Sequence, residues 1–223
     1  MKGLFGGIAD RYDRLNRIMS LSLDRRWRRI ALASSMIPSG ADVLDLACGT
    51  GDFSIETLRR FPDAKVTGVD ISPEMLAIAR RKLSGAADVA FLEGDAQNLM
   101  GVPSGRYSLA VCAFGFRNFP DKAKALRECH RVLKSDGELV VLELFRPGSK
   151  SIGAIVGAWL AFIAFLFARS AKDEYAYLRR SILKTVSADE FISLAEKSGF
   201  TLLRRRSLFP AATCISFRSK GMV

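Results

Sequence analysis

The chain has 223 residues and a formal net charge of +11, and about half of its residues are hydrophobic. This composition excludes a disordered chain, and the length suffices for one large domain with a substantial core. The four cysteines are scattered, without metal-ligand or C-x-x-C spacing, so we expect buried reduced thiols and no metal site. No long apolar run follows the first basic residue, and we expect no signal peptide.

The basic residues gather in four clusters, at 25–29, 80–82, 179–180 and 204–206. Such clusters suit the phosphates of nucleic acid or an anionic membrane surface, and they also occur on ordinary solvated faces. Aromatic residues do not alternate with them and no RNA-binding signature accompanies them, so we expect no nucleic-acid partner.

Residues 1–40 precede the first predicted strand and are expected to form a helical cap over the ligand site. Tyr12 and Trp27 are its most informative side chains. The alternative is an amphipathic helix that packs on the sheet. The rest of the chain, residues 41–223, is expected to form the main domain.

Strand and helix patterns alternate from residue 43 onward. The predicted strands are 43–47, 65–70, 89–92, 107–114, 138–144, 201–208 and 213–218. The predicted helices are 53–60, 72–83, 122–133 and 188–197, the last closed by Gly199. The pattern predicts an α/β fold with a mostly parallel seven-stranded sheet, helices on both faces and a final antiparallel pair.

An apolar segment interrupts this alternation. Residues 152–168 are seventeen uncharged residues bounded by Lys150 and Arg169. A membrane span needs about 20 residues for a hydrocarbon core of ~30 Å. We favour a buried or substrate-lining helix over an interfacial membrane helix, and either of these over a true span. The segment belongs to a hydrophobic insertion at about 148–186, on the substrate side.

The most informative motif is the run V-L-D-L-A-C-G-T-G-D at 43–52, which predicts a strand, a tight glycine turn and a helix start. The third glycine of a dinucleotide fingerprint is replaced by Ser54. Asp45 and Asp52 flank the turn with negative charge, which repels a pyrophosphate and suits a ligand with an ammonium and a sulfonium. The motif therefore favours S-adenosylmethionine over NAD. The alternative is an ordinary strand-to-helix turn.

Ligands in such folds lie outside the carboxyl ends of the parallel strands. We therefore expect the cofactor contacts at Asp45, Gly49, Thr50, Gly51, Asp70, Ile71, Asp95, Ala96 and Ala113. Asp70 is placed to bind the ribose hydroxyls, and Asp95 is placed to accept from the adenine amine.

Methyl transfer from a sulfonium requires in-line positioning and, for a carbon nucleophile, deprotonation of the acceptor. Arg117 could stabilise a phenolate-like oxygen and Asn118 could orient a water, so we predict both as catalytic. His130 lies in the middle of a predicted helix, and we expect no catalytic role for it.

Several stretches carry a family resemblance: F-G-F-R-N at 114–118, Y-A-Y-L with S-I at 175–182, the glycine turn, and R-W-R-R at 26–29. On these the chain resembles the ubiquinone/menaquinone-biosynthesis C-methyltransferase family over nearly its whole length. The resemblance implies a class I, Rossmann-like S-adenosylmethionine-dependent methyltransferase that methylates a ring carbon of a polyprenylated quinol. It implies cofactor contacts at Thr50, Asp70, Asp95 and Ala96.

The resemblance also implies a lining for the isoprenoid tail and a reason for the basic exterior, since the substrate resides in the membrane. We expect substrate contacts at Tyr12, Phe116, Tyr175 and Tyr177. A cytoplasmic location at the inner face of the cytoplasmic membrane, with peripheral attachment, follows as an expectation. A homodimer is allowed by the sequence without being specified by it.

The chain departs from the family pattern at four places, one of which is the segment 152–168, which is more apolar than the family leads us to expect. Asp24 stands where the family often has a histidine, Ala113 where a serine or threonine often precedes Phe-Gly, and residues 183–186 where it has Phe/His-Pro. Because of these departures, the sequence does not decide which quinol ring is the methyl acceptor. We expect C-methylation of demethylmenaquinol, with a benzoquinol of the ubiquinone route as the near alternative. A non-catalytic S-adenosylmethionine-binding module and, from charge alone, an RNA methyltransferase are the others.

Overall fold

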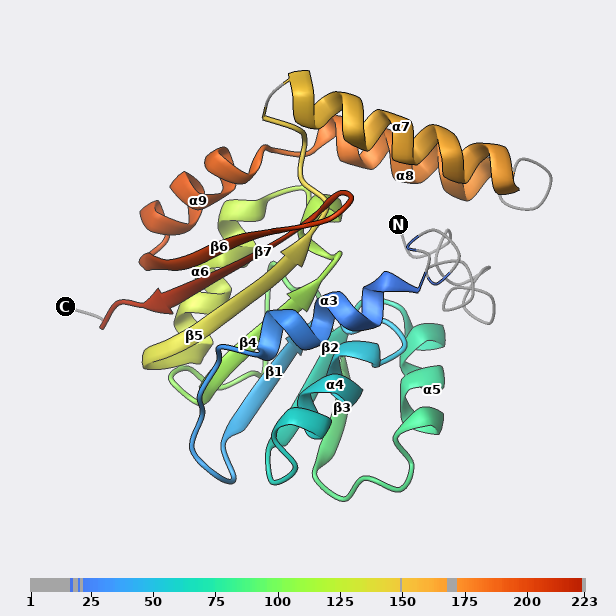
Figure 1. Cartoon of the computed structure of the whole chain (residues 1–223). Coiled ribbons are helices and arrows are strands. Elements are labelled where there is room, and N and C mark those ends of the chain that lie inside the picture. Colours follow the sequence, from blue (N-terminus) through green and yellow to red (C-terminus); the bar gives the residue numbers. More distant parts are fainter. Residues whose placement is uncertain (1–16, 18–19, 21, 149, 168–171, 222–223) are drawn as a thin grey trace.

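The computed structural model describes residues 17, 20, 22–148, 150–167 and 172–221 (Figure 1). About half of the expected N-terminal cap, Tyr12 included, lies outside these residues. The helix that is described there, α3 (Leu23–Leu32), packs its buried Trp27, Ala31 and Leu32 in a core that also contains strand residues. It thus has the packing role that we gave as the alternative to a cap.

One sheet of seven strands organises the described part of the chain, in the order β3-β2-β1-β4-β5-β7-β6. The strands are β1 (Asp42–Leu46), β2 (Lys65–Asp70), β3 (Val89–Glu93), β4 (Tyr107–Ala113), β5 (Leu133–Glu143), β6 (Phe200–Leu208) and β7 (Ala212–Ser219). β1 to β5 pair in parallel, and β7 runs antiparallel between β5 and β6. The predicted mostly parallel sheet with a final antiparallel pair is confirmed.

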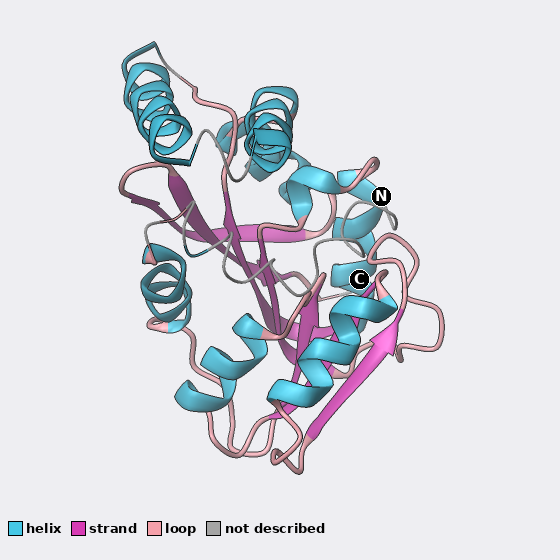
Figure 2. Ribbon diagram, turned by 90° about the vertical axis from the view of Figure 1, so that its right-hand side faces the viewer, coloured by secondary structure: helices cyan, strands magenta, loops and turns pink. Residues whose placement is uncertain are grey.

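Helices cover both faces of the sheet (Figure 2). They are α4 (Asp52–Arg60), α5 (Pro73–Lys82), α6 (Lys122–Val132), α7 (Lys150–Phe167), α8 (Lys172–Lys184) and α9 (Ala188–Lys197), with a short 3₁₀ helix η1 (Phe116–Asn118). α6 and α9 bury side chains against one face, while α3, α4, α7 and α8 do so against the other. Strand residues alternate between the two cores, as Leu109 and Ala110 do, because both faces are covered.

Three strands, β1, β4 and β5, end one residue earlier than the sequence predicts. Ala47 follows β1 with a φ of 49°, and Phe114 follows β4 with a φ of 59°. A positive φ is uncommon for residues with a side chain and turns the backbone out of the extended conformation. A third such residue, Asp136 (φ 63°), lies within β5.

The insertion forms two helices, α7 and α8, which lie side by side beyond the carboxyl end of β5 (Figure 1). Val156 and Trp159 of α7 and Leu178 and Ile182 of α8 are buried in the same core as α3, which agrees with a buried helix, and the substrate-lining role stays a prediction. Within the described residues, no helix is both long enough and apolar enough to cross a membrane.

Candidate functional site

A cavity of about 540 Å³, the first cavity, opens at the carboxyl ends of β1, β2 and β4. Its lining residues are Ala47, Gly49, Asp70, Ile71, Met75, Ala113, Phe114, Gly115, Asn118 and Phe119. It brings together four residues predicted to bind the cofactor (Gly49, Asp70, Ile71 and Ala113) and the predicted catalytic Asn118. The first cavity therefore lies at the carboxyl ends of the parallel strands, where α/β folds with open sheets bind their ligands.

Asp70 is the carboxylate of the first cavity. Its Oδ2 accepts a hydrogen bond from the Gly49 backbone N–H at 2.8 Å, and its Oδ1 accepts one from Ser72 N–H at 2.9 Å. Burial raises the pKa of Asp70, although these backbone donors lower it. A carboxylate has about four lone-pair positions, so Asp70 keeps capacity for the two hydroxyls of a ribose.

The glycine turn itself is confirmed as a tight connection between β1 and α4. Gly51 has a φ of 82°, and a Cβ there would lie 3.3 Å from the Cβ of Ala79. Asp45, beneath the turn, is fully buried and accepts a 2.6 Å hydrogen bond from Ser54 Oγ. Its Oδ1 has no partner within the described residues. Burial raises the pKa of Asp45 to about 7.

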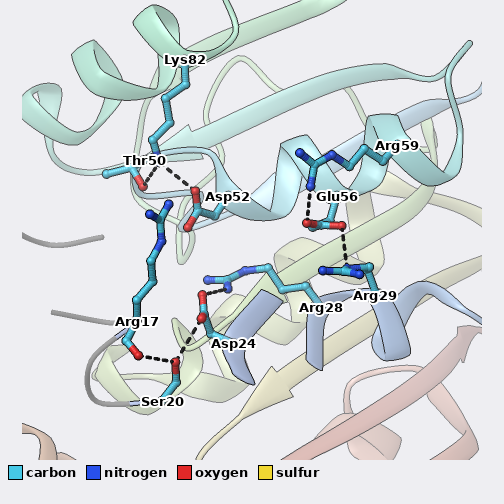
Figure 3. Close-up of polar contacts among 10 residues, drawn as sticks. All are labelled: Arg17, Ser20, Asp24, Arg28, Arg29, Thr50, Asp52, Glu56, Arg59 and Lys82. Carbon is cyan, nitrogen blue, oxygen red and sulfur yellow. Dashed lines mark hydrogen bonds and ion pairs between the residues drawn. The ribbon is translucent and has the colours of Figure 1, made fainter. Parts of the chain in front are cut away.

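The negative charge at the turn is smaller than the sequence indicates. Lys82 Nζ lies 2.7 Å from Asp52 and 2.9 Å from Thr50 Oγ1, and Arg17 also points toward this pair (Figure 3). Burial acts to raise the pKa of Asp52, but Lys82 and nearby arginines outweigh it and the pKa lies below its usual value. Asp52 is therefore neutralised by cations, and Asp70 is the one of these acids that lines the first cavity.

Five other predicted cofactor residues are not in the lining of the first cavity: Asp45, Thr50, Gly51, Asp95 and Ala96. Asp95 accepts a 2.9 Å hydrogen bond from Gln97 N–H in its own loop, and Ala96 is buried. Their cofactor contacts stay predictions.

The first cavity fits a nucleoside cofactor. Two of its walls, Ala47 and Phe114, have strained backbones, and such strain is common at functional sites. Gly115 lets the chain pack closely against β1 and β4, because a Cβ there would lie 2.8 Å from Cys112 Sγ and 2.9 Å from Ala47 Cβ. Together with the Asp70 carboxylate, these features match a ligand that brings its own hydrogen-bond donors.

A second cavity, of about 350 Å³, shares Phe114 with the first. Its lining residues are Ser20, Asp24, Trp27, Phe114, Arg117, Leu144, Trp159 and Leu178. They come from α3, the ends of β4 and β5, and the inserted helices α7 and α8. Aromatic and aliphatic side chains dominate the lining, with Asp24 and Arg117 as its charged members.

Arg117 is held by a buried carboxylate. Its Nη1 lies 2.8 Å from Oε1 of Glu143, which is completely buried, and also donates to the Phe114 carbonyl at 2.6 Å. The Arg117 backbone N–H donates to Glu143 Oε2 at 3.0 Å, and Leu144 N–H donates to Oε1 at 2.7 Å. The guanidinium therefore has a fixed position at the wall of the second cavity.

Asn118 is tied to the insertion. The Tyr177 hydroxyl on α8 donates to Asn118 Oδ1 at 2.9 Å. The predicted substrate residue Tyr177 thus lies beside a predicted catalytic residue. The side chain of Tyr175 is outside the described part of the structure, as is all of Tyr12.

Two other side chains lie away from both cavities. Phe116, which we predicted to contact substrate, is completely buried against Phe119 and Phe191, with ring centroids 5.1 and 4.9 Å away. Its place is therefore in the hydrophobic core, which corrects the expectation of a cavity wall. His130 lies 3.0 Å from the Lys220 carbonyl and packs on Phe200, and it lines neither cavity.

Sequence reasoning gave no role to Glu143 or Trp159, both of which the structure brings to the site. An acid at the end of an otherwise apolar strand was the available signal for Glu143. No pattern in the apolar segment distinguishes Trp159 from its neighbours.

A model of the ubiE/COQ5 methyltransferase family matches residues 1–220. The chain is 40% identical over 202 residues to a demethylmenaquinone methyltransferase of Thermotoga maritima, covering 88% of this chain and 86% of that protein. It is 34% identical over 223 residues to the ubiquinone/menaquinone biosynthesis C-methyltransferase UbiE of Citrifermentans bemidjiense, covering 93% of this chain and 91% of that protein.

Solved structures share the fold. An S-adenosylmethionine-dependent methyltransferase from Thermotoga maritima superposes with a TM-score of 0.69 at 20% identity, covering 99% of this chain and 100% of that chain. An S-adenosylmethionine-dependent methyltransferase from Aquifex aeolicus superposes with a TM-score of 0.63 at 18% identity, covering 86% of this chain and 89% of that chain. The architecture is the class I, Rossmann-like one that the sequence predicts.

Proposed function

Since the chain belongs to the ubiE/COQ5 methyltransferase family, we propose that it methylates a ring carbon of a polyprenylated quinol, converting demethylmenaquinol to menaquinol. Its cofactor is S-adenosylmethionine, which supplies an electrophilic methyl group. The first cavity fits the nucleoside part of that cofactor, with Asp70 for the ribose.

The observation that carries the proposal is the placement of Arg117 and Asn118 on either side of Phe114. Arg117 lines the second cavity, Asn118 lines the first, and Phe114 lines both. A quinol ring carbon becomes nucleophilic when its hydroxyl loses a proton. The guanidinium that Glu143 holds in place stabilises the resulting oxyanion, because preorganised donors act strongly in a site shielded from water.

Asn118 and Tyr177 position the reacting groups and do not stabilise the oxyanion. Their 2.9 Å hydrogen bond ties η1, next to the cofactor cavity, to the inserted helix α8. An acceptor that binds against α8 therefore influences the position of Asn118 at the first cavity. A water held by Asn118 would receive the proton.

The insertion supplies apolar volume for the isoprenoid tail. A third cavity, of about 890 Å³, lies between α7 and the β6–β7 hairpin. Ile155 and Val156 of α7 and Phe209 and Pro210 of the hairpin are among its lining residues. We place part of the tail there.

We further propose peripheral attachment to the inner face of the cytoplasmic membrane. Ile155 and Phe162 on α7 and Leu183 on α8 expose about half of their surface. Arg179 and Arg180 of α8 are exposed as well, and basic residues near a surface favour anionic lipid. The homodimer remains a separate expectation, which sedimentation of the full chain decides.

A competition assay tests the acceptor. The purified protein receives labelled S-adenosylmethionine with demethylmenaquinol and the matching prenylated benzoquinol together, under reducing conditions. We expect label in the naphthoquinol, and label mainly in the benzoquinol would favour the ubiquinone route. Cofactor binding without transfer to either quinol would support the non-catalytic S-adenosylmethionine-binding module. Transfer of label to RNA, in a parallel sample that contains it, would support an RNA methyltransferase.

A further inference from the structure

The lining of the second cavity has the chemistry of a binding site for an aromatic ring. Trp27, Phe114 and Trp159 contribute aromatic walls, and Leu144 and Leu178 contribute aliphatic ones. Trp27 and Phe114 meet edge to face, with centroids 6.3 Å apart. Aromatic and aliphatic walls of this kind bind a planar apolar ligand, and a few polar groups then set its orientation.

Asp24 is one of those polar groups. It is 1% exposed, lies 2.7 Å from Arg28 Nη1 through Oδ2, and accepts a 3.0 Å hydrogen bond from Ser20 Oγ through Oδ1 (Figure 3). Each oxygen keeps a further lone pair, and a carboxylate in this ion pair can only accept hydrogen bonds. Among the described lining residues of the second cavity, Asp24 is the single carboxylate.

The indole N–H of Trp159 is a second polar group of this cavity. The side chain of Trp159 is 8% exposed, and its indole Nε1 is buried without a hydrogen-bond partner in the described part of the chain. Leaving a buried donor unsatisfied is costly, and indole N–H groups in protein interiors usually have a partner. An acceptor oxygen on a bound ligand would satisfy it.

Given the proposed quinol substrate, we propose that the second cavity binds the acceptor ring and selects its reduced form. The Trp159 N–H donates to a ring oxygen, and the Asp24 carboxylate accepts the proton of a ring hydroxyl. A quinol oxygen can do both, since a hydroxyl donates and accepts. A quinone carbonyl can accept from Trp159 but has no proton for Asp24, and it places a lone pair against a carboxylate.

The two residues therefore have separable effects. Trp159 contributes to the binding of both redox forms, because both present an acceptor oxygen. Asp24 contributes only to the binding of the quinol and opposes the quinone. A site that hydrogen-bonds a hydroxyl rejects analogues without it, because its buried polar group is left unpaired.

The test compares the dissociation constants of a short-tailed demethylnaphthoquinol and its quinone, measured anaerobically by calorimetry on protein loaded with S-adenosylhomocysteine. We expect the wild type to prefer the quinol by roughly tenfold to hundredfold. Asp24→Asn is expected to bring the ratio close to one, because an amide can donate to the quinone. Trp159→Phe is expected to weaken both forms by a similar factor and keep the ratio.

Asp42→Asn is the matched control. It removes an Asp–Arg pair, Asp42 to Arg106 at 2.8 Å, from the amino end of β1, where it should leave both dissociation constants unchanged. Equal wild-type affinities for the two forms would overturn the proposal, as would an unchanged ratio in a folded Asp24→Asn. If Asp24→Asn does not fold, a selective loss of quinol binding in Trp159→Phe would overturn it.

The methylation assay separates this inference from the proposed function. Wild-type methyl transfer to the quinol combined with any of these contrary binding results refutes the role of Asp24 and Trp159 alone. Absence of transfer to any quinol refutes the proposed function.

Discussion

Replacing Glu143 by glutamine should lower the stability and the turnover of the protein without changing its affinity for S-adenosylmethionine. The carboxylate is completely buried and receives hydrogen bonds from the Arg117 side chain, the Arg117 N–H and the Leu144 N–H. Glutamine keeps the shape but removes the charge, and its NH₂ faces one of these donors. Breaking one side of a buried ion pair costs about 3–5 kcal/mol.

For a chain of this length, about 2–4 °C of Tm is lost per kcal/mol, so Glu143→Gln should unfold roughly 6–20 °C below the wild type. Calorimetric scanning measures this shift, and a methyl-transfer assay should show turnover strongly reduced, because Arg117 is no longer held. The Kd for S-adenosylmethionine should stay close to wild type. Neither Glu143 nor Arg117 lines the first cavity.

The double variant Arg117→Met, Glu143→Leu is the matched control. An apolar pair in place of a buried ion pair is often neutral for stability. The variant has no uncompensated buried charge, but the backbone N–H groups of residues 117 and 144 lose their acceptor. It should therefore regain part of the lost Tm and remain inactive. Wild-type Tm and turnover in Glu143→Gln would refute the reasoning.

Three further changes test other parts of the site. Arg117→Ala should lower kcat at least ~100-fold, the size of losing one oxyanion-stabilising donor, while calorimetry finds the Kd for S-adenosylmethionine unchanged; unchanged turnover would contradict it. The pKa of Asp45 is raised by burial from 3.8 to about 7, so the folded state binds the extra proton and stability falls as pH rises from about 4 to 7, by up to ~4 kcal/mol. Asp45→Asn should flatten that slope in urea unfolding at pH 4 to 7, and an equal slope in both proteins would count against it. Replacing Ile155 and Phe162 by serine should abolish flotation with anionic vesicles and leave the Tm within 2–4 °C of wild type, since exposed side chains contribute little to stability; full flotation of the variant would exclude α7 as the contact.

Much of the fold follows from local patterns. The buried apolar strands, the helix expected at 72–83 and the glycine turn are decided within a few residues, and the structure contains all of them. The helix begins after Ser72, whose side chain accepts a capping hydrogen bond from Met75 N–H. The strand ends at Ala47 and Phe114 were placed one residue late, because a positive φ at a residue with a side chain leaves no mark in the hydrophobic pattern.

The site was less predictable, because its decisive contacts join distant segments. Lys82 neutralises Asp52 from the far end of another helix, 30 positions along the chain. The pairing of Arg117 with Glu143 and of Asn118 with Tyr177 spans 26 and 59 positions. Phe116 was assigned to substrate from its neighbours in the motif, but the tight turn of η1 directs it into the core. Periodicity carries no information on which long side chains meet.

Methyl transfer to a ring carbon, rather than to a ring oxygen, can be read from the position of an isotopic label in the product. The purified chain is incubated with S-adenosylmethionine carrying a ¹³C methyl group and with demethylmenaquinol, and the product is analysed by NMR. We predict a labelled methyl group on the vacant carbon of the quinone ring, and none with Arg117→Ala. Label on a ring oxygen, or no label in the quinol while cofactor binds, would contradict the account.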